Sequence, residues 1–321
     1  MKQIIPPVDT ALLESELEGH LLRPSNKAGN FIYDITAHEC PNVMREIARL
    51  REISYRDGGG GTGEELDIDQ LDTMTHPYHQ LIVWDPDNRQ IVGGYRYLLG
   101  PEIETDEAGQ PRIASAHLFR FSQTFMTDYL PHVIEFGRAF VQPQYQQREM
   151  GVKALFALDN IWDGIGALLH NHPEIRWMIG KVTLYPNYHT TARELLYAYL
   201  NRYHHGQEGL IEPYHPFHAT LSKDEAGKLA ELINNTFHGE DRKENYHALL
   251  QAIREQGVII PAMFAAYLNL TSQMQTFGTA INDEFGDVLE TGIMVDVETV
   301  YEEKKQRYIT PYLEWLQSQN R

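Results

Sequence analysis

The segment 132–141 reads HVIEFGRAFV, and its apolar, β-branched and aromatic residues make it the strongest strand candidate in the chain. Glu135 and Arg138 stand inside it, three positions apart. On an unbroken strand such residues point to opposite faces, so each charge would be buried among apolar neighbours, at a cost unless it is paired. A β-bulge near Gly137 would bring both side chains to one face, as a functional site or as a structural ion pair.

Strand and helix patterns alternate on both sides of this segment. Strand patterns are found at 30–37, 79–85, 90–99 and 176–185, and helical patterns at 43–55, 150–170 and 191–203. After residue 204 come helical patterns at 223–235 and 242–256, an apolar segment at 258–270 and a late strand at 290–298. This order predicts an α/β or α+β fold with helices packed on a mixed central sheet. We expect a lead-in at 1–28, a core at 29–204 and a C-terminal extension at 205–321 packed on that core.

Composition narrows the function classes. The 321 residues include 27 Lys and Arg against 45 Asp and Glu, a net charge of -18, so the overall field does not favour binding to nucleic acid. The single cysteine, Cys40, excludes an intramolecular disulfide, and no histidine pair has the spacing of a metal site. No apolar run approaches the roughly 20 residues of a membrane span. We therefore expect a cytoplasmic protein without a metal, at most peripheral to the inner membrane.

The connection after the strong strand is a generic anion site. Arg148, Gly151 and Lys153 surround the point where the helix at 150–170 begins. A helix N-terminus at the end of a strand offers backbone N–H donors to phosphate or pyrophosphate, and the two cations would add charge. The alternative is an ordinary strand-to-helix connection with exposed cations.

Five short motifs then follow one another in a characteristic order. They are R-x-x-x-aromatic at 51–55, DQLD at 69–72, GGYR at 93–96, SAHLFRFS at 115–122 and EFGRAFVQPQY at 135–145. In this order they resemble the acyl-carrier-protein-dependent branch of the GNAT acyltransferase superfamily. That branch includes the acyl-homoserine lactone synthases and the ornithine-lipid and glycine-lipid N-acyltransferases, which often carry a hemolysin label. The stretch 260–300 is similar to the C-terminal part of the lipid-forming enzymes.

The resemblance implies a GNAT fold, in which the sheet splays beside a bulged strand, and an activity. We expect an N-acyltransferase that moves a long-chain fatty acyl group, with or without a 3-hydroxy group, from acyl carrier protein to the amine of an amino acid such as glycine or ornithine. Acyl-ACP or acyl-CoA would be the donor, with no permanently bound cofactor and with transient membrane contact. The alternatives are an acetyl-CoA-dependent small-amine N-acetyltransferase and a non-catalytic GNAT-like protein that binds a ligand or associates with a membrane.

The resemblance, together with the needs of acyl transfer from a thioester to an amine, suggests the site residues. The catalytic set is Glu135, Arg138, Asp72, Arg96 and Tyr197, with Glu135 as general base and Tyr197 as the acid that protonates the thiolate. Other positions are expected to bind substrate, and they are Arg51, Tyr55, Asp69, Phe119, Phe121, Phe140, Val141, Arg148, Gly151 and Lys153. The pyrophosphate motif of the superfamily is only partly met at 148–153, which weakens the case for coenzyme A and is compatible with a carrier protein. An acidic carrier would need a basic patch, for which the candidates are Arg45, Arg49 and Arg56 or Arg148 and Lys153.

Overall fold

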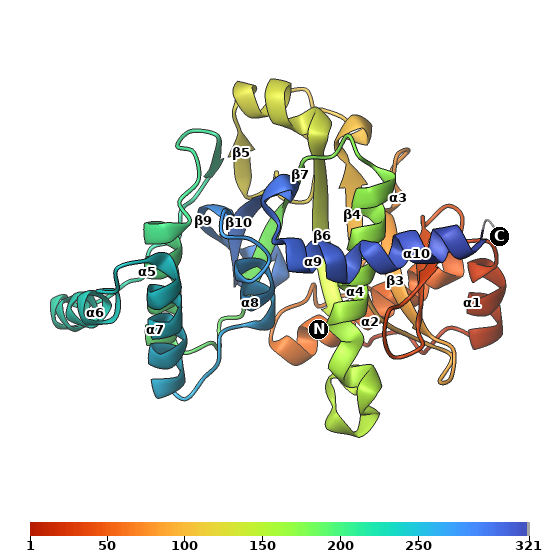
Figure 1. Ribbon diagram of the computed structural model, residues 1–321, viewed down its shortest axis with the longest axis horizontal. Helices are drawn as coiled ribbons and strands as arrows, with labels where there is room; N and C mark the ends of the chain where they lie inside the picture. Colours follow the sequence, from red (N-terminus) through yellow and green to blue (C-terminus); the bar gives the residue numbers. More distant parts are fainter. Residues whose placement is uncertain (320–321) are drawn as a thin grey trace.

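The computed structural model describes residues 1–319 and is built around one large sheet (Figure 1). Its eight strands run in the order β1-β2-β3-β4-β6-β7-β10-β9. Their bounds are Leu21–Pro24, Phe31–Ile35, His79–Asp85, Gln90–Leu99, Val133–Val141, Trp177–Leu184, Val288–Asp296 and Gln275–Asn282, in that order. Neighbouring strands are antiparallel except β6 and β7, which are parallel. The predicted mixed sheet is confirmed.

Helices cover both faces of this sheet. Alternate residues of β3 separate the two sides: Leu81 belongs to the core that includes α4 (Val152–Asn171), while Ile82 belongs to the core that includes α2 (Pro41–Gly58). Because successive strand residues point to opposite faces, α2 and α4 lie on opposite sides of the sheet. The predicted helices at 43–55, 150–170, 191–203, 223–235 and 242–256 are confirmed as α2, α4, α5 (Thr190–Tyr203), α6 (Lys223–Thr236) and α7 (Arg242–Glu255).

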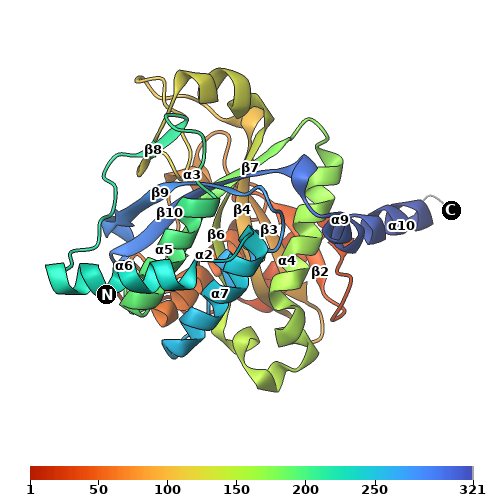
Figure 2. The same ribbon diagram turned by 60° about the vertical axis from the view of Figure 1, so that its left-hand side comes forward.

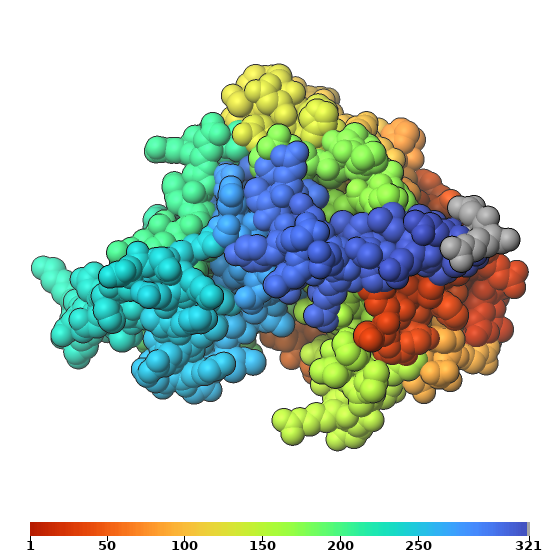
Figure 3. Space-filling model, in the orientation of Figure 1, coloured from red at the N-terminus to blue at the C-terminus, as the bar shows by residue number. Residues whose placement is uncertain are grey.

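Both ends of the chain contribute to the sheet. The lead-in forms α1 (Thr10–Leu17) and β1, which pairs with β2, and the C-terminal region supplies β9 and β10. Strand β10 pairs with β7 from Leu289 to Asp296, so this part of the expected extension is a sheet element. Helices α9 (Glu302–Tyr308) and α10 (Thr310–Gln319) then lie across α4, as the blue band in Figure 3 shows.

Three smaller elements pack around the large sheet. Strand β5 (Phe119–Phe121) pairs with β8 (Ile211–Pro213) in a separate two-stranded sheet. Helix α8 (Ala262–Leu268) lies inside the predicted apolar segment at 258–270 and contacts β7. Figure 2 shows α5, α6 and α7 grouped on the side of the sheet edge that β9 forms. Within residues 1–319, no helix has both the length and the apolar character needed to cross a bilayer.

Strand β6 has the predicted bulge. Against β4, Phe140 is opposite Gly94 and Gly137 is opposite Arg96, so β6 contains one residue more than β4 over this stretch. At the bulge, Arg138 has a positive φ of 51°, a backbone conformation that is strained for a residue other than glycine. Beside β7, β6 is paired only from Val133 to Phe136. The two strands therefore separate at the bulge, and this gap positions the site.

Candidate functional site

An apolar cleft of about 990 Å³ opens where β6 and β7 separate. One wall is the end of β6, including Phe140 and Val141, and another is the first half of α4, including Ala154 and Leu158. The segment 257–263 closes a third side, and the Tyr188 hydroxyl donates a hydrogen bond of 3.0 Å to the Ile259 carbonyl there. The cleft has the volume and apolar lining to hold an acyl chain.

A polar cavity of about 570 Å³ lies on the other side of the same gap. It is lined by α2, α3 (Gln70–Thr73), β4, β6, β7 and β10, together with the turn at 113–117. Four residues line both the cleft and the cavity, and they are Ala139, Thr183, Tyr185 and Met263. An apolar ligand in the cleft and a polar ligand in the cavity would therefore meet at Ala139, directly after the bulge.

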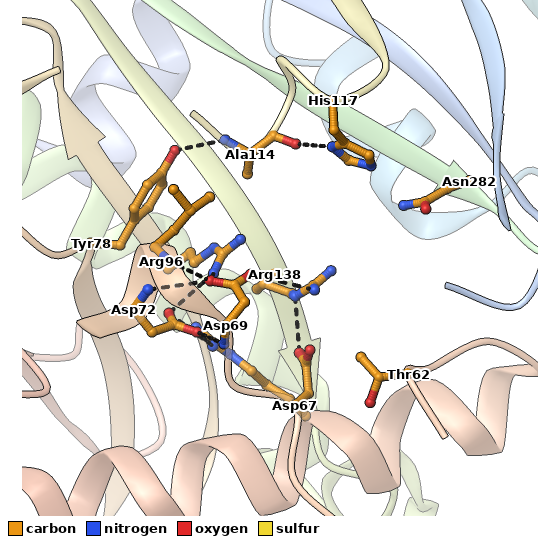
Figure 4. A network of polar contacts seen from close by, with 12 residues as sticks. Thr62, Asp67, Asp69, Asp72, Tyr78, Arg96, Ala114, His117, Arg138 and Asn282 are labelled. Atoms are coloured by element: carbon orange, nitrogen blue, oxygen red, sulfur yellow. Dashed lines mark hydrogen bonds and ion pairs between the residues drawn. The ribbon is translucent and has the colours of Figure 1, made fainter. Parts of the chain in front are cut away.

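A buried charge network forms the floor of the polar cavity (Figure 4). Asp72, on α3, lies 3.3 Å from the Arg51 guanidinium of α2 and 3.2 Å from the Arg96 guanidinium of β4. Arg51 also donates to Gln80, and Arg96 donates to Asp69 over 2.8 Å. Burial by itself would raise the pKa of Asp69 and Asp72. Arg96 outweighs it, together with Arg138 for Asp69 and with Arg51 for Asp72, and both pKa values are lowered. Both carboxylates are thus held ionised.

Arg138 extends this network toward the cavity. Its guanidinium lies 3.0 Å from the Asp67 carboxylate and 3.7 Å from that of Asp69, and it covers the ring of Phe285 at 4.5 Å. Arg138 and Asp69 both line the cavity. Because the bulge turns Arg138 toward the side of β6 where α2 packs, it shares one carboxylate, that of Asp69, with Arg96. The structure thus brings together Arg51, Asp69, Asp72, Arg96 and Arg138.

Glu135 lies on the same side of β6 but behind the cavity wall. Its Oε1 accepts hydrogen bonds from the Ser115 backbone N–H at 2.8 Å and from the Ser115 hydroxyl at 2.5 Å. Its Oε2 accepts from the Ala114 N–H at 3.2 Å and from the Tyr78 hydroxyl. The side chain is buried, and it is not part of the cavity lining. Both carboxylate oxygens are therefore engaged in holding the turn at 113–117.

That turn carries a histidine that sequence reasoning missed. The His117 ring lines the cavity, and its Nδ1 lies 2.8 Å from the Ala114 carbonyl oxygen. Lys181, on β7, also donates to that carbonyl and pairs with Glu290 of β10 at 2.6 Å. Asn282 donates to Glu290 as well, while its own Oδ1 is buried without a hydrogen-bond partner in the described part of the chain. Charges inside strands at 176–185 and 290–298 were the available signal for Lys181 and Glu290.

Three other predicted residues line one of the two spaces, and a fourth, Tyr197, lines neither. Tyr55 lines the polar cavity with a buried hydroxyl, and its ring packs edge-on against Phe285. Phe140 and Val141 line the apolar cleft. Tyr197 is buried on α5 with its ring against Phe217 and lines neither space.

Phe119 and Phe121 are also away from both spaces. They are buried in the core beneath β5, where the Phe119 ring would be the nearest neighbour of a side chain placed at Gly292. Their acyl-chain role is not supported by a direct contact with the cleft.

The expected phosphate site has its own counter-ions. Lys153 donates to Asp85 at 2.7 Å and to Asn30 at 3.0 Å, and it pairs with Asp87 at 3.0 Å. Arg148 is exposed, and Gly151, with a φ of 53°, precedes the first residue of α4. Lys153 is therefore already neutralised by the chain itself.

The basic face of α2 is neutralised in the same way. Arg49 is bound to Glu46, and Arg56 is bound to Glu52, each within the helix. Arg45 is exposed on this helix. Arg254, which lines the apolar cleft, is a further exposed cation close to its opening.

The chain is similar to known proteins. Residues 50–155 match the acetyltransferase (GNAT) domain family. The chain is 48% identical to a glycine N(alpha)-acyltransferase from Bacteroides thetaiotaomicron, covering 98% of this chain and 91% of that protein. It is 45% identical to a glycine N(alpha)-acyltransferase from Phocaeicola vulgatus, covering 98% and 94%. A CoA-dependent acyl-homoserine lactone synthase solved with SAM and isopentyl-CoA aligns over 87% of each chain at 11% identity, with a TM-score of 0.35.

Proposed function

The chain belongs to the family of the glycine N(alpha)-acyltransferases and is an N-acyltransferase with a GNAT domain, and we propose that it joins a long-chain fatty acyl group to the amine of glycine. The donor is a thioester of acyl carrier protein, and the product is an acyl-amino-acid lipid. The observation that carries the proposal is the junction of an apolar cleft with a polar cavity at Ala139, beside the bulge of β6.

The cleft supports a long-chain donor. Its volume of about 990 Å³ far exceeds the need of an acetyl group, and its walls on α4 and at 257–263 are mainly apolar. Each buried methylene contributes about 0.8 kcal/mol, so such a wall selects long chains. The thioester carbonyl would lie at the open end of β6. There the Gln142 N–H donates to the Val92 carbonyl on β4, and by strand alternation the Val141 N–H points the other way, into the gap. An N–H in that position stabilises the developing oxyanion.

The polar cavity supports an amino-acid acceptor. Arg138 and Lys181 supply positive charge for an acceptor carboxylate, while Asp69 and Glu290 keep the two cations oriented. A guanidinium is well matched to a carboxylate, which it binds through two parallel hydrogen bonds. The walls around the junction are crowded by Tyr185, so a small acceptor such as glycine fits better than a long side chain.

The region near the cleft opening supports a carrier protein more than free coenzyme A. Coenzyme A carries a diphosphate and a further phosphate, whereas Lys153 at the start of α4 is already paired with Asp85 and Asp87. Arg148 and Arg254 remain exposed near the cleft and would meet the single phosphate of a pantetheine arm or the acidic surface of its carrier. Binding of this kind weakens as salt is added.

The test measures thiol release and product mass from the purified full chain. The donors are palmitoyl carrier protein, its 3-hydroxy form, palmitoyl-CoA and acetyl-CoA, each with glycine, ornithine or glycine methyl ester. We expect glycine-dependent release from the long-chain carrier donors, with a product of the mass of N-acylglycine. The methyl ester is the matched control for carboxylate recognition and should react poorly. Activity confined to acetyl-CoA, or acceptance of ornithine in place of glycine, would contradict the proposal.

A further inference from the structure

The turn at 113–117 presents an imidazole to the polar cavity in a defined tautomer. The Ala114 carbonyl oxygen can only accept a hydrogen bond, so the His117 Nδ1 that lies 2.8 Å from it is the protonated nitrogen. In the neutral ring the other nitrogen, Nε2, then keeps its lone pair. Figure 4 shows the ring directed across the cavity toward Asn282. The cavity therefore contains a nitrogen that can take up a proton.

Charges around the ring keep it neutral. Burial lowers the pKa of His117 below its ordinary value, and the ammonium of Lys181 lowers it further. Glu290 and Glu284, from β10 and the turn before it, act in the opposite direction but do not outweigh these effects. Near neutral pH the imidazole is thus in the form that a base needs.

Glu135 determines where this ring lies. Its two oxygens bind the backbone N–H groups of Ala114 and Ser115, which fixes the peptide whose carbonyl orients His117. The carboxylate has four donors and does not line the cavity. A carboxylate in this setting holds a turn, and it has no free lone pair directed at a substrate amine.

We propose that His117 is the general base of the acyl transfer and that Glu135 is its positioning residue. This inference rests on the proposed function, because it concerns the same amine and the same thioester. It replaces the sequence-based expectation that Glu135 itself removes the proton. It is motivated by the geometry of the cavity, in which His117 is exposed to the acceptor space and Glu135 is not.

The chemistry balances with His117 in this role. The lone pair of the amine nitrogen forms the new C–N bond, and the π pair of the thioester carbonyl moves onto oxygen. Nε2 takes the proton that the attacking nitrogen loses. When the carbonyl reforms, the C–S bond breaks with its electron pair on sulfur, and the imidazolium returns the proton to that thiolate. The products are an amide and a thiol, and the base is regenerated.

The test compares pH profiles of kcat/KM for the wild type and three variants. His117→Asn keeps an N–H that can donate to the Ala114 carbonyl but removes the base, and we expect kcat/KM to fall about 10²- to 10⁴-fold. In the wild type both the amine and the imidazole must be deprotonated, whereas in His117→Asn only the amine must be. On the acid side of its pH profile, kcat/KM of the wild type should therefore rise more steeply with pH than that of His117→Asn. Glu135→Gln should lose activity but keep the steeper limb, with its midpoint shifted toward the ordinary histidine value. His247→Asn, on the exposed side of α7, is the matched control and should behave as the wild type.

Opposite profiles would overturn the inference. If His117→Asn keeps the steeper acid limb and Glu135→Gln loses it, Glu135 is the base. A wild type that transfers no acyl group to glycine contradicts the proposed function instead. Nitrogen NMR of the histidine rings tests the geometry without any turnover: we expect His117 protonated on Nδ1 and titrating below the ordinary histidine range. A ring protonated on Nε2 would contradict the inference even if His117→Asn fails to fold.

Discussion

Replacing Asp72 by Asn removes the one charge that two buried arginines share. The carboxylate is fully buried, and Arg51 and Arg96 lie 3.3 Å and 3.2 Å from it. Within residues 1–319, Arg51 has no other carboxylate at ion-pair distance, so Asp72→Asn leaves it as an uncompensated buried charge. Removing one partner of a buried ion pair costs about 3–5 kcal/mol, a large part of an ordinary folding stability of about 5–15 kcal/mol.

Equilibrium unfolding in urea measures this cost. We expect a lower midpoint for Asp72→Asn at an unchanged slope, which corresponds to about 3–5 kcal/mol in the free energy of unfolding. Asp224→Asn is the matched control, because Asp224 pairs with Lys228 on the exposed face of α6. Its change should stay within about 0.5 kcal/mol. A loss of under about 1 kcal/mol for Asp72→Asn would refute the view that the network holds the cavity floor.

The same variant gives a pH test with a definite sign. Burial opposes ionisation of Asp72, but Arg96 and Arg51 outweigh it and lower the folded-state pKa. A lowered carboxyl pKa contributes stability that is present above the unfolded value of about 3.9 and is lost as pH falls through the folded value. The stability difference between wild type and Asp72→Asn should therefore be constant near neutral pH and shrink below about pH 4. A difference that widens on acidification would contradict the assignment.

Two further substitutions test the cleft and its junction with the cavity. Ala154→Phe fills part of the cleft, so the donor with the highest kcat/KM should have a shorter acyl chain. For longer donors, kcat/KM should fall about fourfold for each methylene that no longer fits. Leu155→Phe, on the exposed side of α4, is the control and should keep the wild-type preference. Gly58→Ala places a methyl group 2.7 Å from the Tyr185 ring, so it should displace that ring from the junction and lower kcat/KM without a change in chain-length preference. Gly227→Ala, with open space around it, is its control and should leave kinetics unchanged.

The central part of the fold could be predicted because its sequence signals are local. In 132–141 the two charges three positions apart required a bulge, and the structure has it at Arg138. The edge strands β1 and β9 were not predicted. They are short or contain polar residues and a glycine, Gly278, and they exist because a neighbouring strand offers hydrogen bonds to them. Such a strand forms because a neighbouring strand is present, and the sequence of the segment itself carries no information about that neighbour.

The polar cavity could be predicted only in part for a related reason. Asp72 and Arg96 belong to motifs whose order along the chain resembles a known family, so their assembly could be anticipated. Lys181 and Glu290 have no such motif, and each is one charge inside a strand whose partner is far away in the chain. His117 was missed because its role depends on the direction of a turn, which Glu135 fixes from another strand.

Lys153 shows that a cation at the start of a helix does not by itself indicate a ligand site. The sequence puts it at the start of a helix that follows a strand, where phosphate binds readily. The hairpin of β3 and β4 supplies Asp85 and Asp87, and these acids bind the ammonium before any ligand does. A diphosphate would have to compete with both carboxylates for Lys153 and would leave the buried Asp85 without its cation, whereas a pantetheine arm carries only one phosphate. The counter-ions of Lys153 are therefore one of the grounds on which we propose a carrier-bound donor.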